Sequence, residues 1–429
     1  MKKFYTFIFI LLFLTFNFNE FSKSYNFFIL ETNKLFAFKF PLLKKNNNSL
    51  NKTISENSQL NKLAFNTYTL ISGDFSTLTF IPSYMFSDYF GFQYLRDSDA
   101  SKNGNNSAYV IKVASRVLNI LNSDQKKILT ELTKDELRDI QKLARLRITI
   151  IKAFYLLFSQ NETVSGKSLN KNAVKNFTGK MYELDAKISV FKTEAFAKIY
   201  STLTTEQKNA FESMKYADSP SWPEVKDDNI INKELSGKSS SFKNTYISFL
   251  CDLYSMIYGS SEADSYFNPD RQSFYFGGFY EYKMAEQQNK DSFSSTSYYE
   301  NKANDVLKIL NFKQKEIFFN LIDNQIDSLR AIVKTRKSLS YEFRKILYGE
   351  KIDTSKIYKL ACLYGELDGE ISCSDLLAFL KINQTLTPDQ RQKIFNLRDT
   401  KDDKTVLYYI LTEPVKSDTE TFKTDRFFK

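Results

Sequence analysis

Two pairs of carboxylates recur at matching places in this chain of 429 residues: Glu183 with Asp185, and Glu366 with Asp368. Paired carboxylates can act as metal ligands or as a general acid and base. Residues two apart on a helix diverge by about 200°, however, so neither pair can form one site by itself. We therefore expect these side chains to lie on a solvated face or to form ion pairs with the preceding helix.

The chain contains no histidine, which removes the commonest general acid and base and the commonest zinc and copper ligand. Its three cysteines, Cys251, Cys362 and Cys373, include no CxxC pair. Cys362 and Cys373 would lie about 16 Å apart along one expected helix, which is too far for a disulfide. We expect three single buried thiols and predict no catalytic residue, no metal site and no cofactor.

A second group of acidic residues lies beside the aromatic sequence YFGGFY at positions 275–280. Carboxylates next to aromatic rings can bind a sugar or a cation. The same stretch contains an Asn-Pro-Asp sequence at 268–270, which is typical of a turn. Both interpretations stay open, and the alternative ligand cleft would consist of Glu262, Asp264, Asp270, Arg271 and Tyr275.

Basic residues also recur at matching positions, since Arg145 corresponds to Lys334 and Arg147 to Arg336. A surface that mixes basic groups with exposed aliphatic groups suits loosely structured polypeptides of neutral to acidic charge. We predict these four residues as a partner-binding surface; the alternative is an ordinary solvated bundle exterior. The nearby apolar surface would come from Leu143, Leu146, Ile150, Ile332 and Val333.

A duplicated sequence positions all these candidates. Val306–Phe318 repeats Val117–Leu129 with eight of thirteen residues identical, and ELDGEIS at 366–372 repeats ELDAKIS at 183–189. An aromatic segment, 65–94, corresponds to 259–282, in the alignment that places Gly73 on Gly259. Repeats of this kind predict two equivalent structural units related by a pseudo-twofold.

Apolar residues at helical spacing predict three amphipathic helices in each unit. The fold class is therefore mainly α: tandem duplicated helical bundles, with aromatic irregular or short-strand segments leading into each copy. In the second helix of the first unit the spacing predicts one heptad seam. The seam contains Val174, Phe177, Met181, Leu184, Ile188, Phe191 and Ala195.

The domain organisation begins with a basic start and a 13-residue apolar run at 4–16, which is typical of a secretory signal. We predict a signal peptide at 1–24, a low-complexity linker at 25–59, a first repeat at 60–216, a hinge at 217–245 around SPSWPEV, a second repeat at 246–399 and a C-terminal tail at 400–429. The helix over 241–258 should be buried and end before Gly259. We expect an extracytoplasmic protein with no stable membrane span after cleavage.

Four segments share the pattern L-[TN]-x-x-Q and are expected to start helices. A Thr or Asn N-cap with Gln three residues later is a capping box, and Pro388 would occupy the first helical position. The segments are Leu121–Gln125, Leu203–Gln207, Leu310–Gln314 and Leu386–Gln390.

Over roughly 117–216 and 306–399 this motif resembles the Spy/CpxP (LTxxQ-motif) family of periplasmic proteins. The resemblance implies an all-helical protein that binds non-native polypeptides on a concave surface without ATP. This chain departs from the family in carrying two copies in tandem and in its aromatic segments. The layout, with SWPEV, YFGGFY and YGELDG, also resembles a group of uncharacterised secreted bacterial proteins.

Three functions follow as hypotheses. The first is an exported, non-enzymatic protein that binds non-native or exported polypeptides, as a chaperone or envelope-stress protein would. The second is a carboxylate-dependent protein that binds or hydrolyses glycans, and the third is a structural surface protein. The net charge is +10, but the basic residues do not cluster into a stripe, so no nucleic-acid partner is expected.

Overall fold

The computed structural model describes residues 56–72, 105–159, 168–214, 222–258 (except 226 and 228), 303–397 and 425–428. These residues all belong to the unit Asn47–Lys429. They are almost entirely helical, and their one β interaction is an isolated bridge between Leu169 and Phe428. The prediction of a mainly α fold is confirmed.

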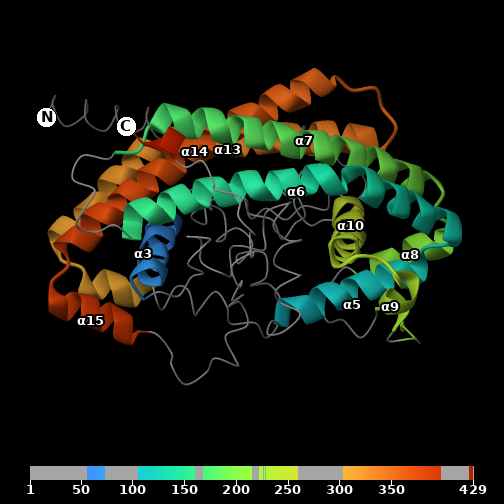
Figure 1. Cartoon of the computed structure of the whole chain (residues 1–429), viewed down its shortest axis with the longest axis horizontal. Coiled ribbons are helices and arrows are strands. Elements are labelled where there is room, and N and C mark those ends of the chain that lie inside the picture. The colour runs from blue at the N-terminus through green and yellow to red at the C-terminus, as the bar shows by residue number, and fades with distance from the viewer. Residues whose placement is uncertain are drawn as a thin grey trace, which may run out of the picture. The chain divides into compact units, whose positions relative to one another are not determined.

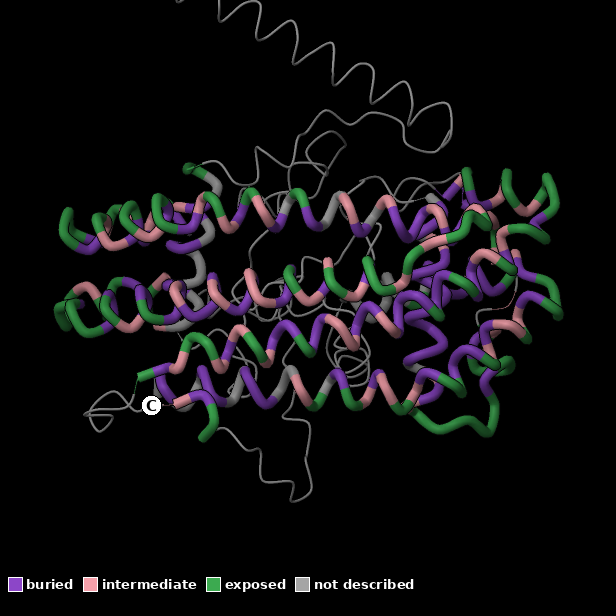
Figure 2. The backbone as a smooth tube through the Cα atoms, turned by 90° about the horizontal axis from the view of Figure 1, so that it is seen from above, coloured by how far each residue is buried: buried purple, intermediate pink, exposed green. Residues whose placement is uncertain are grey.

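Four long helices form the centre of the fold: α6 (Ser123–Ser159), α7 (Lys171–Ser201), α13 (Phe312–Leu347) and α14 (Thr354–Thr385). The most extensive interface joins α7 to α14, while α6 packs on α7, and α13 packs on α14 and α7 (Figure 1). Buried and exposed residues alternate along each helix (Figure 2), as amphipathic helices require.

Shorter helices complete the described chain. They are α3 (Glu56–Ser72), α5 (Asn105–Ile120), α8 (Thr205–Ser213), α9 (Ile230–Glu234), α10 (Ser240–Tyr258), a helix at 303–309, α15 (Pro388–Asn396) and the 3-10 turn η2 (Asp425–Phe427). In the part of the chain that the structure describes, no helix is long and apolar enough to cross a membrane.

Local sequence signals explain where the helices begin and end. Thr204, Asn311 and Thr387 each form a capping box with the Gln three residues on, and Asn122 exchanges the same two hydrogen bonds with Gln125. All four predicted helix starts are therefore confirmed. At the end of α13, Gly349 has φ +75°, and the amides of Gly349 and Glu350 reach back to Ile346 and Lys345, which is a Schellman motif.

Helices α7 and α14 run antiparallel and approach each other closely at three glycines. A Cβ at Gly365 would overlap the Thr178 carbonyl and the Tyr182 ring, and one at Gly369 would overlap the Thr178 side chain. On α7, a Cβ at Gly179 would stand 2.9 Å from Cγ of Glu366. Absent side chains at these positions let the two backbones come together, which buries both helices deeply.

Contacts across the α7–α14 interface are reciprocal. Lys175 forms an ion pair with Glu370 at 2.8 Å, and the Lys187 ammonium lies 5.5 Å from the centre of the Tyr358 ring. The alignment that places ELDAKIS on ELDGEIS also places position 175 on 358 and position 187 on 370. The two contacts therefore join equivalent pairs of positions: the position that α7 contributes to one contact is contributed by α14 to the other.

The helices α3 and α10 lie at corresponding places in the sequence but on different halves of the bundle. The alignment that places Gly73 on Gly259 carries α3 onto 242–258, the span of α10. In space, α10 contacts α5, α6, α7 and α8, whereas α3 contacts α13, α14 and α15. Each helix thus packs on core helices of the half that does not follow it in sequence.

The heptad seam on α7 was predicted too narrowly. Val174, Met181, Ile188 and Ala195 are buried, but Phe191 is 53% exposed and Leu184 is only half-buried. Because α7 has neighbours on several sides, its buried surface extends to Asp185, Lys192, Phe196 and others outside the seam. A heptad seam is the contact surface for one partner helix, whereas α7 packs against several helices.

Several boundaries differ from expectation. Helix α3 begins at Glu56, inside the expected linker, and α9 and the start of α10 lie inside the expected hinge. Trp222 is not on an open hinge either: it is buried under the guanidinium of Arg116, 5.3 Å from the ring centre. Cys251 and Cys373 are buried as predicted, and Cys362 is half-buried.

Candidate functional site

The recurring carboxylates do not form a solvated face. Asp185 and Asp368 are both fully buried between the long helices, and the Tyr182 hydroxyl donates a hydrogen bond to Asp368. Glu183 remains half-exposed and pairs with Lys187 at 2.8 Å on its own helix rather than with α6. The expectation of solvent-facing carboxylates was wrong for both aspartates, because α7 and α14 are covered on more sides than the sequence pattern indicated.

The predicted basic surface is partly described. Arg145 and Lys334 are exposed, whereas the side chains of Arg147 and Arg336 lie outside the described residues. Three of the apolar neighbours expected to accompany them, Leu143, Ile150 and Ile332, are buried in the core. Leu146 is half-buried, so the described part of this surface is basic with less exposed aliphatic area than we predicted. Glu262, Asp264, Asp270, Arg271 and Tyr275, the alternative cleft, all lie outside the described residues.

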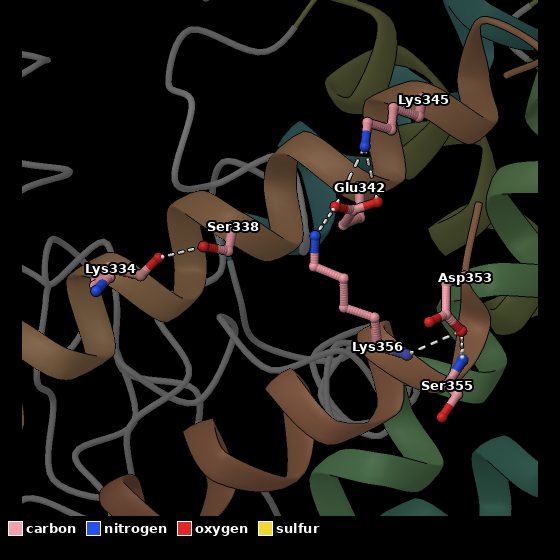
Figure 3. Close-up of polar contacts among 7 residues, drawn as sticks. All are labelled: Lys334, Ser338, Glu342, Lys345, Asp353, Ser355 and Lys356. Atoms are coloured by element: carbon pink, nitrogen blue, oxygen red, sulfur yellow. Dashed lines mark hydrogen bonds and ion pairs between the residues drawn. The ribbon is translucent and has the colours of Figure 1, made fainter. Parts of the chain in front are cut away.

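Lys334 lies on the same face of α13 as a polar cluster that reaches the start of α14 (Figure 3). The Ser338 hydroxyl donates to the Lys334 carbonyl at 3.0 Å, one turn before Glu342. Glu342 is buried and accepts from Lys356 at 2.6 Å and from Lys345 at 3.3 Å. The hydrogen bond to Glu342 raises the pKa of Lys356, and the cluster ties α13 to α14 rather than facing a partner.

Exposed apolar side chains instead lie at the start of α13. Phe312, the first residue of α13, is 78% exposed, and Phe319, two turns later on the same face, is 37% exposed. Phe312 follows directly on the capping residue Asn311, so the helix start holds the ring in solvent. Two rings on one helix face form a small apolar patch, and a patch is more informative on a protein surface than a single exposed side chain.

An open pocket of about 530 Å³ lies at this same corner, between helix 303–309 and α13. Its lining contains Lys308 and Lys315, which precede Phe312 by four residues and follow it by three. Lys308 is paired with Asp305 at 3.0 Å. The corner thus combines two ammonium groups with two exposed phenyl rings, which we name the α13 corner (Lys308, Phe312, Lys315 and Phe319).

The sequence holds a signal for the α13 corner at positions where the two halves differ. In the alignment that places Gln125 on Gln314, Phe312 and Phe319 correspond to Ser123 and Thr130 of the first half. A search for residues that both halves share passes over a surface that only one half carries. Two aromatic residues replacing two hydroxyl residues on one exposed helix face would have identified it.

No metal-binding group of three or more Cys, Asp or Glu side chains occurs in the part of the chain that the structure describes. The buried ionisable groups include an ion pair between Lys192 and Asp252 at 2.9 Å. Burial, and then the neighbouring Asp139 and Asp135, raise the pKa of Glu136 to about 7.

Comparison with known proteins adds no relative: no family model, no curated protein and no solved structure matches this chain.

Proposed function

We propose that this chain is an exported, non-enzymatic helical protein that binds other polypeptides, in the manner of an ATP-independent chaperone or an envelope-stress protein. The observation that carries the proposal is the exposure of Phe312 and Phe319 on the helix whose Lys315 lines an open pocket. Exposed rings can hold an apolar segment, and lysines speed the encounter with acidic chains. The resemblance of the four L-[TN]-x-x-Q segments to the Spy/CpxP family favours the same function.

We further propose that the chain consists of two copies of one unit, related by an internal pseudo-twofold. The exchanged contacts of Lys175 with Glu370 and of Lys187 with Tyr358 support it, since a twofold axis relates contacts in this way. The crossed placement of α3 and α10 also supports it. A chain built so needs no second copy of itself to complete the bundle, which favours a monomer.

The test is suppression of aggregation of a reduced, unfolding client by the purified full-length chain. Wild type should slow aggregation, and Phe312→Ser/Phe319→Ser should weaken the effect several-fold without a change in helicity. Phe191→Ser is the matched control, because that ring is 53% exposed elsewhere on the bundle. Wild-type binding should fall as salt rises, because exposed charges are screened.

A wild-type chain that leaves aggregation unchanged would contradict the proposal and favour a structural surface protein. An equal loss of aggregation suppression in the control Phe191→Ser would show that the α13 corner is not the binding surface. Arg145→Glu/Lys334→Glu tests the basic surface in the same assay. Export is tested separately, by an N-terminus between about residues 20 and 40 in mass spectra of the native protein.

A further inference from the structure

The last residues of the chain are seated on the beginning of α7. The main-chain amide of Asn170 donates to the Phe427 carbonyl at 2.8 Å, and Leu169 pairs with Phe428 in an antiparallel bridge. Phe427 is fully buried, and its ring meets the Phe177 ring edge-on at 4.9 Å between centres. The segment also contacts α6. A short stretch of polypeptide, distant in sequence, is therefore held by main chain and side chain together.

The start of α7 is built to receive such a stretch. Asn170 is the N-cap, so its side chain accepts from the Ala173 amide at 3.2 Å while its own backbone is extended. An N-cap amide has no partner within its own helix, and here it donates to the Phe427 carbonyl of η2. The Asn170 side chain therefore caps α7, while the backbone amide of the same residue binds the C-terminal segment.

A third contact involves Arg426, the residue that precedes the buried Phe427. The guanidinium of Arg426, itself exposed, lies 5.5 Å from the centre of the Phe177 ring and 5.8 Å from that of Phe427. A cation over an aromatic face is attracted by the ring quadrupole, and arginine is the commonest partner. The site therefore favours a basic residue followed directly by an aromatic one.

We propose that Leu169, Asn170 and Phe177 form a recognition site for polypeptide segments in which a basic residue precedes an aromatic residue, and that the chain's own C-terminus occupies it in cis. The inference goes beyond the proposed function, because this site lies at the start of α7 and contains no residue of the α13 corner. The contacts are of a transferable kind: main-chain pairing accepts any sequence, and the ring pocket and the cation contact supply the selectivity. A segment from another polypeptide would displace residues 425–428.

Competition by the tethered C-terminus sets the expected result. A covalently attached segment acts at a high effective concentration, so the intact chain should bind a free peptide weakly. The probe is the fluorescent peptide TDRFFK, the sequence of residues 424–429. By anisotropy, a chain ending at Lys423 should bind this probe at least tenfold more tightly than the intact chain does.

Matched changes on both partners give the controls. The same peptide with Phe427→Ala should bind the shortened chain at least tenfold more weakly, and so should the natural peptide to a shortened chain with Phe177→Ala. Equal binding of both peptides, or equal binding to intact and shortened chains, would overturn the proposal. Dimers of the intact chain that the peptide dissociates would also overturn it, by assigning the site to a second copy.

A second protein covers the case in which the shortened chain does not fold. A full-length chain with a protease site inserted after Asp418 folds with its C-terminus in place and is cut afterwards. Labelled peptide should then exchange with the released segment, whereas a segment that stays bound under excess peptide would be a fixed part of the fold. Phe312→Ser/Phe319→Ser should leave peptide binding unchanged, so failure of the client assay and failure of this site are distinguishable.

Discussion

Gln207 donates a hydrogen bond from its side-chain amide to Oε1 of Gln125 at 2.8 Å, and Gln125 donates one back at 3.2 Å. Each glutamine also closes the capping box of its own helix, so two helix starts are locked to each other. Gln314 and Gln390 form the same reciprocal pair in the second half, at 2.9 and 3.2 Å. The L-[TN]-x-x-Q motif therefore acts as a clasp between α6 and α8, and again between α13 and α15.

Removing one member of a clasp should destabilise the fold. Gln207→Ala and Gln390→Ala should each lower the free energy of unfolding by about 1–3 kcal/mol, because the N-cap amide loses its side-chain acceptor and the buried Gln125 or Gln314 side chain loses a partner. Urea titration followed by circular dichroism measures both. Gln392→Ala is the control: that exposed side chain bonds Asn396 within its helix and should change stability by less than about 0.5 kcal/mol. Unaltered stability in both clasp variants would show that the motif does not hold the helices together.

Close helix approach makes the α7–α14 glycines sensitive to a single methyl group. Gly365→Ala should cost about 1–3 kcal/mol or more, because its Cβ meets main chain of Thr178, which cannot move aside. Gly179→Ala should cost less, since its Cβ would meet side-chain atoms first, Cγ of Glu366 at 2.9 Å, and would stay 3.3 Å from the nearest main-chain atom, the Cys362 carbonyl. Thermal unfolding of both variants gives the comparison, and a smaller loss for Gly365→Ala than for Gly179→Ala would contradict this packing.

The buried ion pair between Lys192 of α7 and Asp252 of α10 should respond unequally to single and double changes. Lys192→Met leaves the Asp252 carboxylate buried without its cation, which typically costs about 3–5 kcal/mol. Lys192→Met/Asp252→Leu should recover most of that loss, because no buried charge remains. Lys393→Met breaks an exposed pair with Asp389 and should cost less than about 1 kcal/mol. Chemical denaturation of wild type and the three variants measures these differences. A double variant that is less stable than Lys192→Met would contradict the prediction.

Glu136 should make stability depend on pH. Its pKa is raised to about 7 in the folded state, so the native protein retains a proton that the unfolded chain releases. The contribution of Glu136 to the free energy of unfolding is fully present below about pH 4.5, and it is lost as pH rises through 7. Glu136→Gln should remove this dependence and raise stability above pH 7 by roughly 1–2 kcal/mol, because solvent screens part of the effect.

Gln325 occupies the corresponding position of the second half and donates to Asp375 at 2.7 Å, so an amide is compatible with this place in the bundle. The exposed Glu131→Gln is the control and should leave the pH profile of the melting temperature unchanged. A Glu136→Gln variant with the wild-type profile between about pH 4.5 and 8 would refute the assignment.

Helix identity and helix ends could be predicted from the sequence because both depend on residues within a few positions of each other. Apolar spacing predicted the long helices, and a Thr or Asn followed three residues later by Gln predicted the starts of α6, α8, α13 and α15. A capping box is formed by two neighbouring turns of chain and needs no distant partner. The same signal did not indicate that Gln125 and Gln207 would also bond to each other, since a local pattern carries no information on which helix start lies opposite.

Only the tertiary structure decided which surfaces are covered. An amphipathic pattern indicates how wide the apolar face is, but Asp185 and Asp368 are buried because α7 and α14 have neighbours on several sides at once. Helix α3 packs across on α13–α15, and Phe427 fills a place at the start of α7, although neither lies near its partner in sequence. Packing free energy depends on the area that two surfaces remove from water together, so the choice among several apolar faces is made only when the whole chain folds.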